Sequence, residues 1–304
     1  MYTANFPSAT NRLRRRLVLV LAAGLLSAAA QACDRSCLKG VLDHYLEAVF
    51  RHSPADAALA DGHRATENAR VLVNGDSVWA SVTGYGSVGR RYVDVPGQQV
   101  AYFGLLEEST GPVLASVRIK VAAGQVLEAE WTVARAAYGG MFSVAGLEQD
   151  PPPEVVLLPA AQRTPRAQML QAAGAYFEAL QRHDGSAVPH IDGCERVENG
   201  VRVTHSRRPP TAAPGAAQEA LSGDCVAGFE AFAHSIASTD LRRFPLVDEE
   251  AGVVMGTTLF HRPPGASLRR NLLTEYFHIR QGRIAAIYAA MFYLPPDAAD
   301  STGW

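Results

Sequence analysis

The sequence contains two copies of one pattern, and this internal repeat constrains the fold more than any other feature. Residues 45–52 read YLEAVFRH and residues 176–183 read YFEALQRH, at an offset of 176 minus 45, or 131. Further short matches support the repeat: Asp61-Gly62 with Asp192-Gly193 and Glu67-Asn68 with Glu198-Asn199 at the same offset, and Arg91 with Arg243 after an insertion. We therefore predict two diverged copies of one domain.

Residues 1–32 have the pattern of a secretory signal peptide. Arginines between residues 12 and 16 precede an apolar run at residues 17–26, and Ala30-Gln31-Ala32 provides a small-residue cleavage site. The apolar run is too short to span a bilayer, which takes about 20 apolar residues. We expect export to the periplasm or the exterior, with no membrane span after cleavage; an uncleaved anchor and a lipoprotein at Cys33 are the alternatives.

The boundary between the two copies is marked by proline. Pro151, Pro152 and Pro153 stand in a row, which forbids helix and favours an extended spacer. We predict a first domain at residues 33–150 and a second at 151–304, with a linker at about residues 148–164. Removing the leader leaves 304 minus 32, or 272 residues, and half of that is close to the repeat offset.

The four cysteines all follow the predicted cleavage site, and an even number in an exported protein favours disulfides. Three pairings are possible. A four-residue helical spacing brings two Cα atoms to about 6 Å, so we favour Cys33 with Cys37 and Cys194 with Cys225. A zinc site is the competing interpretation, but the sequence has no closely spaced pair of Cys or His ligands, and we expect no metal.

Each copy has the same predicted order of elements, with helix first and strands afterwards. Apolar residues fall at helical spacing from Leu38 to Val49 and again from Met169 to Leu180. The strands are then expected at residues 71–73, 78–82, 100–103, 113–121 and 126–133 of the first copy, and at 201–203, 253–260, 273–280 and 284–293 of the second. This order predicts an α+β fold in which helices cover one face of an antiparallel sheet.

A family resemblance follows from these features. The Tyr-bearing first helix, the Asp-Gly turn and a late hairpin such as residues 277–287 resemble the nuclear transport factor 2-like superfamily and its SnoaL-like members. Residues 33–38, 66–68 and 243–250, with the ending Gly303-Trp304, also resemble a secreted tandem family of unknown function. The resemblance implies two tandem cone-like domains, each a curved antiparallel sheet wrapped on N-terminal helices around an apolar cavity. Its members include isomerases, dehydratases, cyclases and non-catalytic binding modules, so the fold does not give the function.

Composition narrows the partners. Lys and Arg number 28 against 30 Asp and Glu, which leaves no basic excess to neutralise a nucleic-acid backbone. The motifs of serine hydrolases, nucleotide-binding loops and zinc proteases are absent from the sequence. We therefore expect a small-molecule ligand, no cofactor and no nucleic acid.

Asymmetry between the copies suggests a catalytic site in the second. Asp248-Glu249-Glu250 is aligned with Pro96-Gly97-Gln98, so the second copy has gained carboxylates that could serve as acid or base. His278 lies between two apolar strand residues and is the candidate acid. A solvated turn and a solvent-facing His278 are the alternative interpretations.

Polar residues that occur in both copies are candidate substrate-binding groups. They are Glu67, Asn68, Glu198, Asn199 and Arg243. Arg64, which has no counterpart in the second copy, is a further candidate that could hold an anionic substrate or bond Glu67. A structural interpretation is open for each, because Asn-Gly favours turns and a Glu–Arg pair can join helix and sheet.

Two hypotheses follow from the sequence. In the first, the protein is an exported, cofactor-free lyase or isomerase that abstracts a proton from a small ring-containing molecule, with Asp248 or Glu249 as base and His278 as acid. In the second, it is a non-catalytic protein in which the two domains pair within one chain and hold a ligand or nothing.

Overall fold

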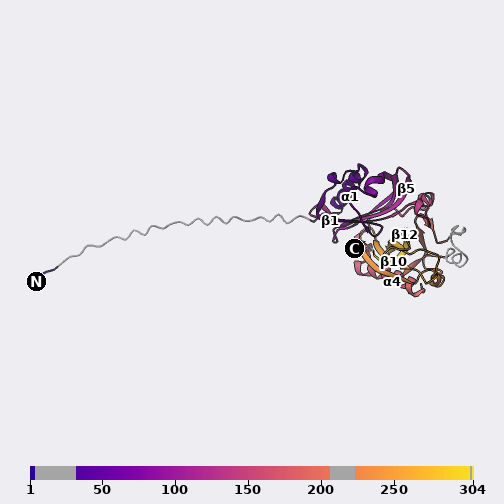
Figure 1. Cartoon of the computed structure of the whole chain (residues 1–304). Helices are drawn as coiled ribbons and strands as arrows, with labels where there is room; N and C mark the ends of the chain where they lie inside the picture. The colour runs from indigo at the N-terminus through magenta and orange to yellow at the C-terminus, as the bar shows by residue number, and fades with distance from the viewer. Residues whose placement is uncertain (4–31, 206–222, 302) are drawn as a thin grey trace. The chain divides into compact units, whose positions relative to one another are not determined.

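A computed structural model describes residues 1–3, 32–205, 223–301 and 303–304. Ala32–Trp304 forms one compact unit (Figure 1). The predicted signal peptide, save for its ends, lies outside the described residues. Within the described part of the chain, the helices are all too short or too polar to cross a membrane.

The first half begins with a helix and continues into a six-stranded sheet of order β2-β1-β6-β5-β4-β3. Its elements are α1 (Arg35–Phe50), η1 (Pro54–Asp56), β1 (Leu59–Glu67), β2 (Arg70–Val71), α2 (Val78–Ser81), β3 (Val82–Asp94), β4 (Gln99–Glu108), β5 (Gly111–Ala122) and β6 (Gln125–Ala134). The segment that leads to the second half contains η2 (Ala136–Tyr138), α3 (Val144–Gln149) and η3 (Ala160–Gln162).

The second half repeats this order, with a sheet of order β8-β7-β12-β11-β10-β9. Its elements are α4 (Arg166–Arg182), β7 (His190–Glu198), β8 (Val201–Arg202), η4 (Phe229–His234), β9 (Ser238–Asp248), β10 (Val253–His261), β11 (Asn271–Arg280) and β12 (Arg283–Tyr293). The protein is therefore a mixed α+β protein with two six-stranded sheets, one from each half.

Each sheet is mixed, whereas the sequence predicts an antiparallel one. β3 to β6 and β9 to β12 are joined by antiparallel pairing as expected. However, β1 runs parallel to β6, and β7 runs parallel to β12. Four strands separate the members of each pair in sequence, so no hairpin joins them and their direction is set by tertiary packing.

The strand expected at residues 78–82 is wrong, because residues 78–81 form the short helix α2. Val78 and Trp79 are consecutive and both fully buried, which a single helical turn allows and an alternating half-buried strand does not. The Trp79 ring packs edge-on against Tyr45 of α1 at 5.4 Å. The backbone N–H of Val78 donates to the Glu67 carboxylate at 3.2 Å and starts this turn.

Each sheet has two buried faces. One face of the first sheet packs on α1 and one face of the second packs on α4, as the separate core clusters of the two halves show (Figure 1). A third cluster joins the remaining faces of both sheets and includes Tyr92, Phe103, Tyr276 and Tyr288. The sheets therefore contact each other through the faces that the helices leave uncovered.

Both disulfides favoured from the sequence are present. Cys33 is bonded to Cys37 at the start of α1, and Cys194 on β7 is bonded to Cys225, each pair with Cα atoms 5.2 Å apart. The side chain of Asp34 caps α1 by accepting from the Cys37 N–H at 2.8 Å.

Candidate functional site

Asp248, a predicted catalytic base, is fully buried where the two halves meet. Its carboxylate forms an ion pair with Arg35 of α1. It also accepts from the backbone N–H of Val93 at 2.7 Å and of Ala251 at 3.0 Å. These contacts join the second half to the first and leave the carboxylate surrounded by protein donors.

Asp94 is the counterpart of Asp248 in the first half. Each aspartate ends the first strand of a hairpin, and Asp94 pairs with Gln99 as Asp248 pairs with Val253. The Asp94 carboxylate bonds Arg166 of α4 at 2.7 Å and the N–H of Val247 at 2.9 Å. The alignment of Asp248 with Pro96 is therefore corrected, since both copies have this aspartate and only the next two carboxylates are new.

We call the contacts of Asp94 with Arg166 and of Asp248 with Arg35 the reciprocal latch. In each case the arginine begins the helix of one half and the aspartate ends a strand of the other half. The arrangement is two-fold in pattern, as in an isologous interface between two identical subunits.

Glu249 and His278 also have structural contacts. The Glu249 carboxylate accepts from the backbone N–H of Arg166 at 3.0 Å, at the start of α4. His278 lies between the rings of Tyr92 and Tyr288, at 5.8 and 5.7 Å. Burial, and secondarily the charges of nearby arginines, lowers the pKa of His278 to about 3, so its ring is neutral at pH 7.

The register puts two of the three predicted catalytic residues in one row of the second sheet. Val253 pairs with Asp248 on one side and with His278 on the other. Both side chains are buried, on the face that contacts the first sheet. The row is therefore part of the contact between the sheets.

The repeated asparagines hold the parallel strand pairs together. Asn68 donates to the Val133 carbonyl at 3.1 Å and accepts from the Val133 N–H at 2.8 Å. Asn199 makes the same two bonds to Met291, at 2.9 and 2.7 Å. Both asparagines have positive φ, of 51° and 46°, which this residue type tolerates. These contacts favour the structural interpretation of the asparagines.

The predicted binding residues of the first half lie in separate places. Glu67 forms an ion pair with Arg135 at 2.9 Å. Arg64 donates to the Gly303 carbonyl and stacks 4.5 Å from the centroid of the Trp304 ring. The end of the chain is therefore seated on the first sheet.

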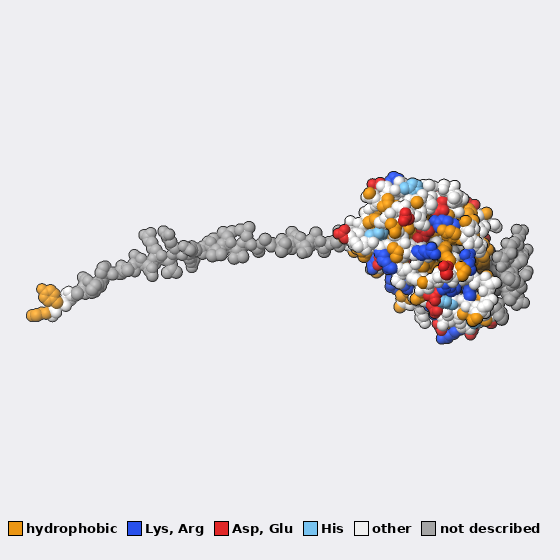
Figure 2. Space-filling model, in the orientation of Figure 1, with side chains coloured by type: hydrophobic (Ala, Val, Ile, Leu, Met, Phe, Trp, Pro, Cys, Tyr) orange, Lys and Arg blue, Asp and Glu red, His pale blue; other side chains and the backbone are white. Residues whose placement is uncertain are grey.

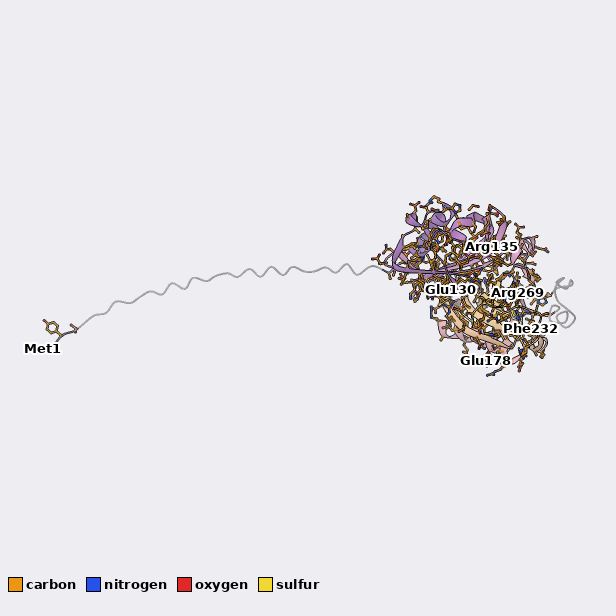
Figure 3. The ribbon with its side chains drawn as sticks, in the orientation of Figure 1. Met1, Glu130, Arg135, Glu178, Phe232 and Arg269 are labelled. Atoms are coloured by element: carbon orange, nitrogen blue, oxygen red, sulfur yellow. A yellow bond between two sulfur atoms is a disulfide. The ribbon has the colours of Figure 1, made fainter. Side chains whose placement is uncertain are left out.

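Arg243 forms an ion pair with Glu130, which is labelled in Figure 3. Glu130 also binds Arg118 on the neighbouring strand at 3.1 Å. These charges connect β9 of the second half to β5 and β6 of the first. Basic and acidic side chains are also interspersed over the molecular surface in the view of Figure 2.

A different cluster stands out within the second half, and we call it the Glu275 cluster: Tyr176 of α4, Arg196 and Glu198 of β7, and Glu275 of β11. Glu275 is 1% exposed, and no described group bonds its Oε2 atom. A buried carboxyl oxygen without a partner is unusual in proteins and marks a candidate site.

The other members of the cluster are bonded to one another. Arg196 donates to the Tyr176 hydroxyl at 3.0 Å and to the Cys225 carbonyl at 3.1 Å. Its Nε atom lies 3.1 Å from a Glu198 carboxylate oxygen. The positive charge of Arg196 is thereby matched by the negative charge of Glu198.

Burial is the main influence on the protonation of Glu275, and the charges of the cluster modify it. Burial raises the pKa of Glu275 to about 8, the charge of Glu198 adds to the rise, and Arg196 opposes it. Burial likewise raises the pKa of the Tyr176 hydroxyl. At pH 7 both groups are mainly neutral, so each can donate a proton in a hydrogen bond.

Aromatic rings surround the cluster. The Tyr176 ring makes edge contacts with Phe229 at 5.4 Å and with Phe277 at 5.3 Å. Phe232, labelled in Figure 3, lies 5.3 Å from the Arg196 guanidinium. The apolar surroundings explain the large effect of burial on Glu275.

The first half is apolar at the positions that match Glu275 and Arg196. Glu67 pairs with Trp131 and Trp131 with Val117, just as Glu198 pairs with Ala289 and Ala289 with Glu275. Val117 thus replaces Glu275, and the Trp131 Nε1 atom, 3.3 Å from the Tyr45 hydroxyl, replaces the Arg196 donor.

Sequence reasoning missed Glu275 and Arg196. At the repeat offset of 131, Arg196 aligns with Ala65, which is a visible signal. Glu275 aligns with Val117 only at an offset of 158, which is 275 minus 117, so the strand register is needed to find it.

Two open grooves lie elsewhere on the described surface. One, of about 630 Å³, follows α1 from Asp34 to Asp43. The other, of about 300 Å³, is lined by Gln168, Gln171, Ala172 and Ala175 of α4, with Ala187, Pro189 and Gly282. The part of the chain that the structure describes has no cluster of His, Cys, Asp and Glu suited to a metal ion.

Comparison with known families gives one match. A family model described as a domain of unknown function (DUF8021) matches residues 162–291, which contain all four members of the Glu275 cluster. The chain matches no curated protein.

Proposed function

We propose that the second half binds a small, ring-containing molecule and transfers a proton to or from it, as a cofactor-free lyase or isomerase. The observation that carries this proposal is the buried, unpartnered carboxyl oxygen of Glu275. A carboxyl with a raised pKa can give up a proton and take it back near neutral pH, which is what acid–base catalysis needs.

The cluster also offers a second hydrogen-bond donor. The Tyr176 hydroxyl accepts from Arg196, and among the described residues no acceptor bonds its own hydrogen. A neutral ligand with a carbonyl or hydroxyl oxygen suits Glu275 and Tyr176, since Arg196 is already paired with Glu198. The surrounding phenylalanine rings suit a flat apolar ligand body.

This proposal extends the resemblance to the SnoaL-like families. A sheet wrapped on α4, with polar groups between them, suits the cone of that superfamily. The first half would then be a filled cone, with Trp131 and Val117 in its interior, that pairs with the second half as a subunit pairs with its copy. A signal peptide and two disulfides would place this protein outside the cytoplasm.

A non-catalytic role is the second candidate. Arg196 is 3% exposed and Glu275 only 1%, so these two residues are closed to solvent, whereas the Glu198 side chain is 18% exposed. Buried ionic clusters of this kind can also define a single packing arrangement. In that case the second half is a binding or structural module.

The test is a mass-spectrometric screen of periplasmic or culture-fluid molecules with the purified protein. We compare the wild type with Glu275→Gln, which keeps the size of the side chain and removes its acid. Glu249→Gln is the matched control, because Glu249 caps α4 outside the cluster. We expect Glu275→Gln to lose about 100-fold or more in turnover and Glu249→Gln to match the wild type.

Other outcomes select among the hypotheses. Loss of turnover in Glu249→Gln alone would favour the site predicted from sequence. A molecule that is retained without any mass change would favour the binding role. Equal turnover in all three proteins would refute Glu275 as the acid.

A further inference from the structure

The Glu275 cluster is covered by one segment, residues 223–237, which we call the cover. It contains η4 and places Phe229 against Tyr176 and Phe232 against Arg196. If the cluster receives a ligand, as in the function proposed above, some part of its surroundings has to move. The sheet, α4 and the cover differ in how they are held in place.

The sheet and α4 are held by regular hydrogen bonds. β7 pairs with β12, β12 with β11 and β11 with β10 over most of their lengths. α4 is a continuous helix of 17 residues whose apolar face is buried. Opening any of these elements would break many backbone bonds at once.

The cover is held differently. Several backbone N–H groups of residues 224–236 bond to carbonyls of the same segment, for example Ala227 to Asp224 at 3.1 Å and Ile236 to Phe232 at 2.7 Å. The first described N–H that pairs with the sheet is that of Ala237, with His261 at 2.8 Å. The cover therefore can move without breaking the sheet.

Its polar attachments lie at its two ends, while Phe229 between them is buried in the core of the second half. At one end, Cys225 is bonded to Cys194 on β7, and its carbonyl accepts from Arg196. At the other end, the Ile236 carbonyl bonds the His183 ring at 2.7 Å, and the Ser235 carbonyl accepts from Arg262 at 2.6 Å. Phe229 and Phe232 lie between these two anchored ends.

The first half has a shorter counterpart without a disulfide. There α2 places Trp79 on Tyr45, and the Trp79 carbonyl bonds the His52 ring at 2.7 Å, as the Ile236 carbonyl bonds His183. The cysteines of that half are bonded to each other at the start of α1. The tethered cover thus occurs in the half that holds the charged cluster.

We propose that the cover is the gate through which a ligand reaches the Glu275 cluster, and that the Cys194–Cys225 disulfide is its hinge. The disulfide joins the strand that carries Arg196 to the carbonyl that Arg196 bonds, so it also positions this arginine. Cys194 and Cys225 are positioning residues in this proposal, because they act through Arg196 and the cover.

The experiment uses the full chain and measures amide hydrogen exchange by mass spectrometry, together with binding of Nile red as a neutral apolar probe. The control is Cys33→Ser/Cys37→Ser, which removes the other disulfide and keeps the hinge. Dithiothreitol can then reduce only Cys194–Cys225 in this folded variant. Both cysteines are fully buried, so alkylation of the freed thiols, detected by mass, confirms the reduction before exchange is measured.

We expect reduction to speed exchange about tenfold in residues 223–237 and at the neighbouring amides of β7 and β11, because the cover opens locally. Nile red binding should increase in parallel, and residues 59–134 should exchange as before. No change in the second half, or an equal increase in both halves, would overturn the proposal.

A second variant tests the alternative route. Ala175→Phe fills the groove of about 300 Å³ beside α4. Probe binding after reduction should be the same with and without this substitution, and its loss would make the groove the entrance instead. Glu275→Gln should leave the exchange of the cover unchanged, so a failure of the proposed chemistry and a failure of the gate give different results.

Discussion

The reciprocal latch makes a strong quantitative prediction, because the chain contains it twice. Replacing Asp248 by alanine removes an ion pair with Arg35 and leaves the N–H groups of Val93 and Ala251 without their acceptor. Removing one partner of a buried ion pair typically costs about 3–5 kcal/mol. Arg35 keeps a contact with Glu250, so we expect a loss of about 3 kcal/mol.

Asp94→Ala should cost about the same. It removes the ion pair with Arg166 and leaves the N–H groups of Val247 and Gly97 without their acceptor. Both aspartates are fully buried, and each arginine is partly exposed. The asparagine variants should each lose less, because an amide oxygen can still accept from a backbone N–H.

Urea unfolding followed by circular dichroism measures these changes at pH 7. Asp61→Ala is the control, because Asp61 is exposed on β1, and it should change the free energy of unfolding by less than about 0.5 kcal/mol. Losses at Asp94 and Asp248 that differ by more than about 2 kcal/mol would refute the two-fold latch. A stable Asp248→Ala protein that had lost only turnover would return Asp248 to the catalytic role predicted from sequence.

Three further predictions concern buried groups. Because the folded-state pKa of Glu275 is raised to about 8, its neutral form is favoured in the folded protein; this contribution is complete below the unfolded pKa and is lost as pH rises toward 8. Glu275→Gln should therefore remove a fall of about 1.4 kcal/mol per pH unit in urea titrations between pH 5 and 8. The pKa of His278 is lowered to about 3, so the opposite sign applies, and His278→Leu should reduce the loss of stability as pH falls from 6 to 4. Removing Cys194–Cys225, which spans 31 residues, should cost about 3–4 kcal/mol of unfolding free energy by calorimetry, more than removing Cys33–Cys37.

The sequence predicts the parts of this fold that depend on local pattern. The repeat at residues 45–52 and 176–183 predicts two equivalent halves, and each has a helix and a six-stranded sheet. The hairpins from β3 to β6 follow from apolar runs separated by turns. The four-residue spacing of Cys33 and Cys37 predicts their bond, although Cys33 lies just before α1 and not within it.

Features set by distant contacts are harder to find in the sequence. β1 ends at Glu67, and its parallel pairing with β6 depends on how the next residue, Asn68, bonds Val133, 65 residues later. In the sequence, Asp94 and Asp248 resemble ordinary turn residues. In the structure, each forms an ion pair with an arginine of the other half. Their burial follows from the contact between the sheets, which the sequence of either half does not contain.

The Glu275 cluster illustrates the same limit for function. In the sequence, Glu275 stands between Thr274 and Tyr276 in an apolar strand and resembles a solvent-facing residue. In the fold, alternation turns it toward α4 together with Phe277, while Tyr276 turns toward the other sheet. The second sheet is covered by α4 on one face and by the first sheet on the other, so neither face of its strands is exposed. A polar residue in these strands therefore does not indicate a solvent-facing position.

The contact between two similar halves explains how one chain can contain such a cluster. Burying Arg196 and Glu275 without a full set of partners opposes folding, because polar groups lose hydration that their contacts only partly replace. The first half has Trp131 and Val117 at the matching positions and contributes a densely packed apolar core. The reciprocal latch and the shared core couple the two halves. The stability of the first half therefore offsets the cost of burying polar groups in the second. The apolar core of the first half thus allows the second half to contain Glu275, an acid with an unbonded oxygen.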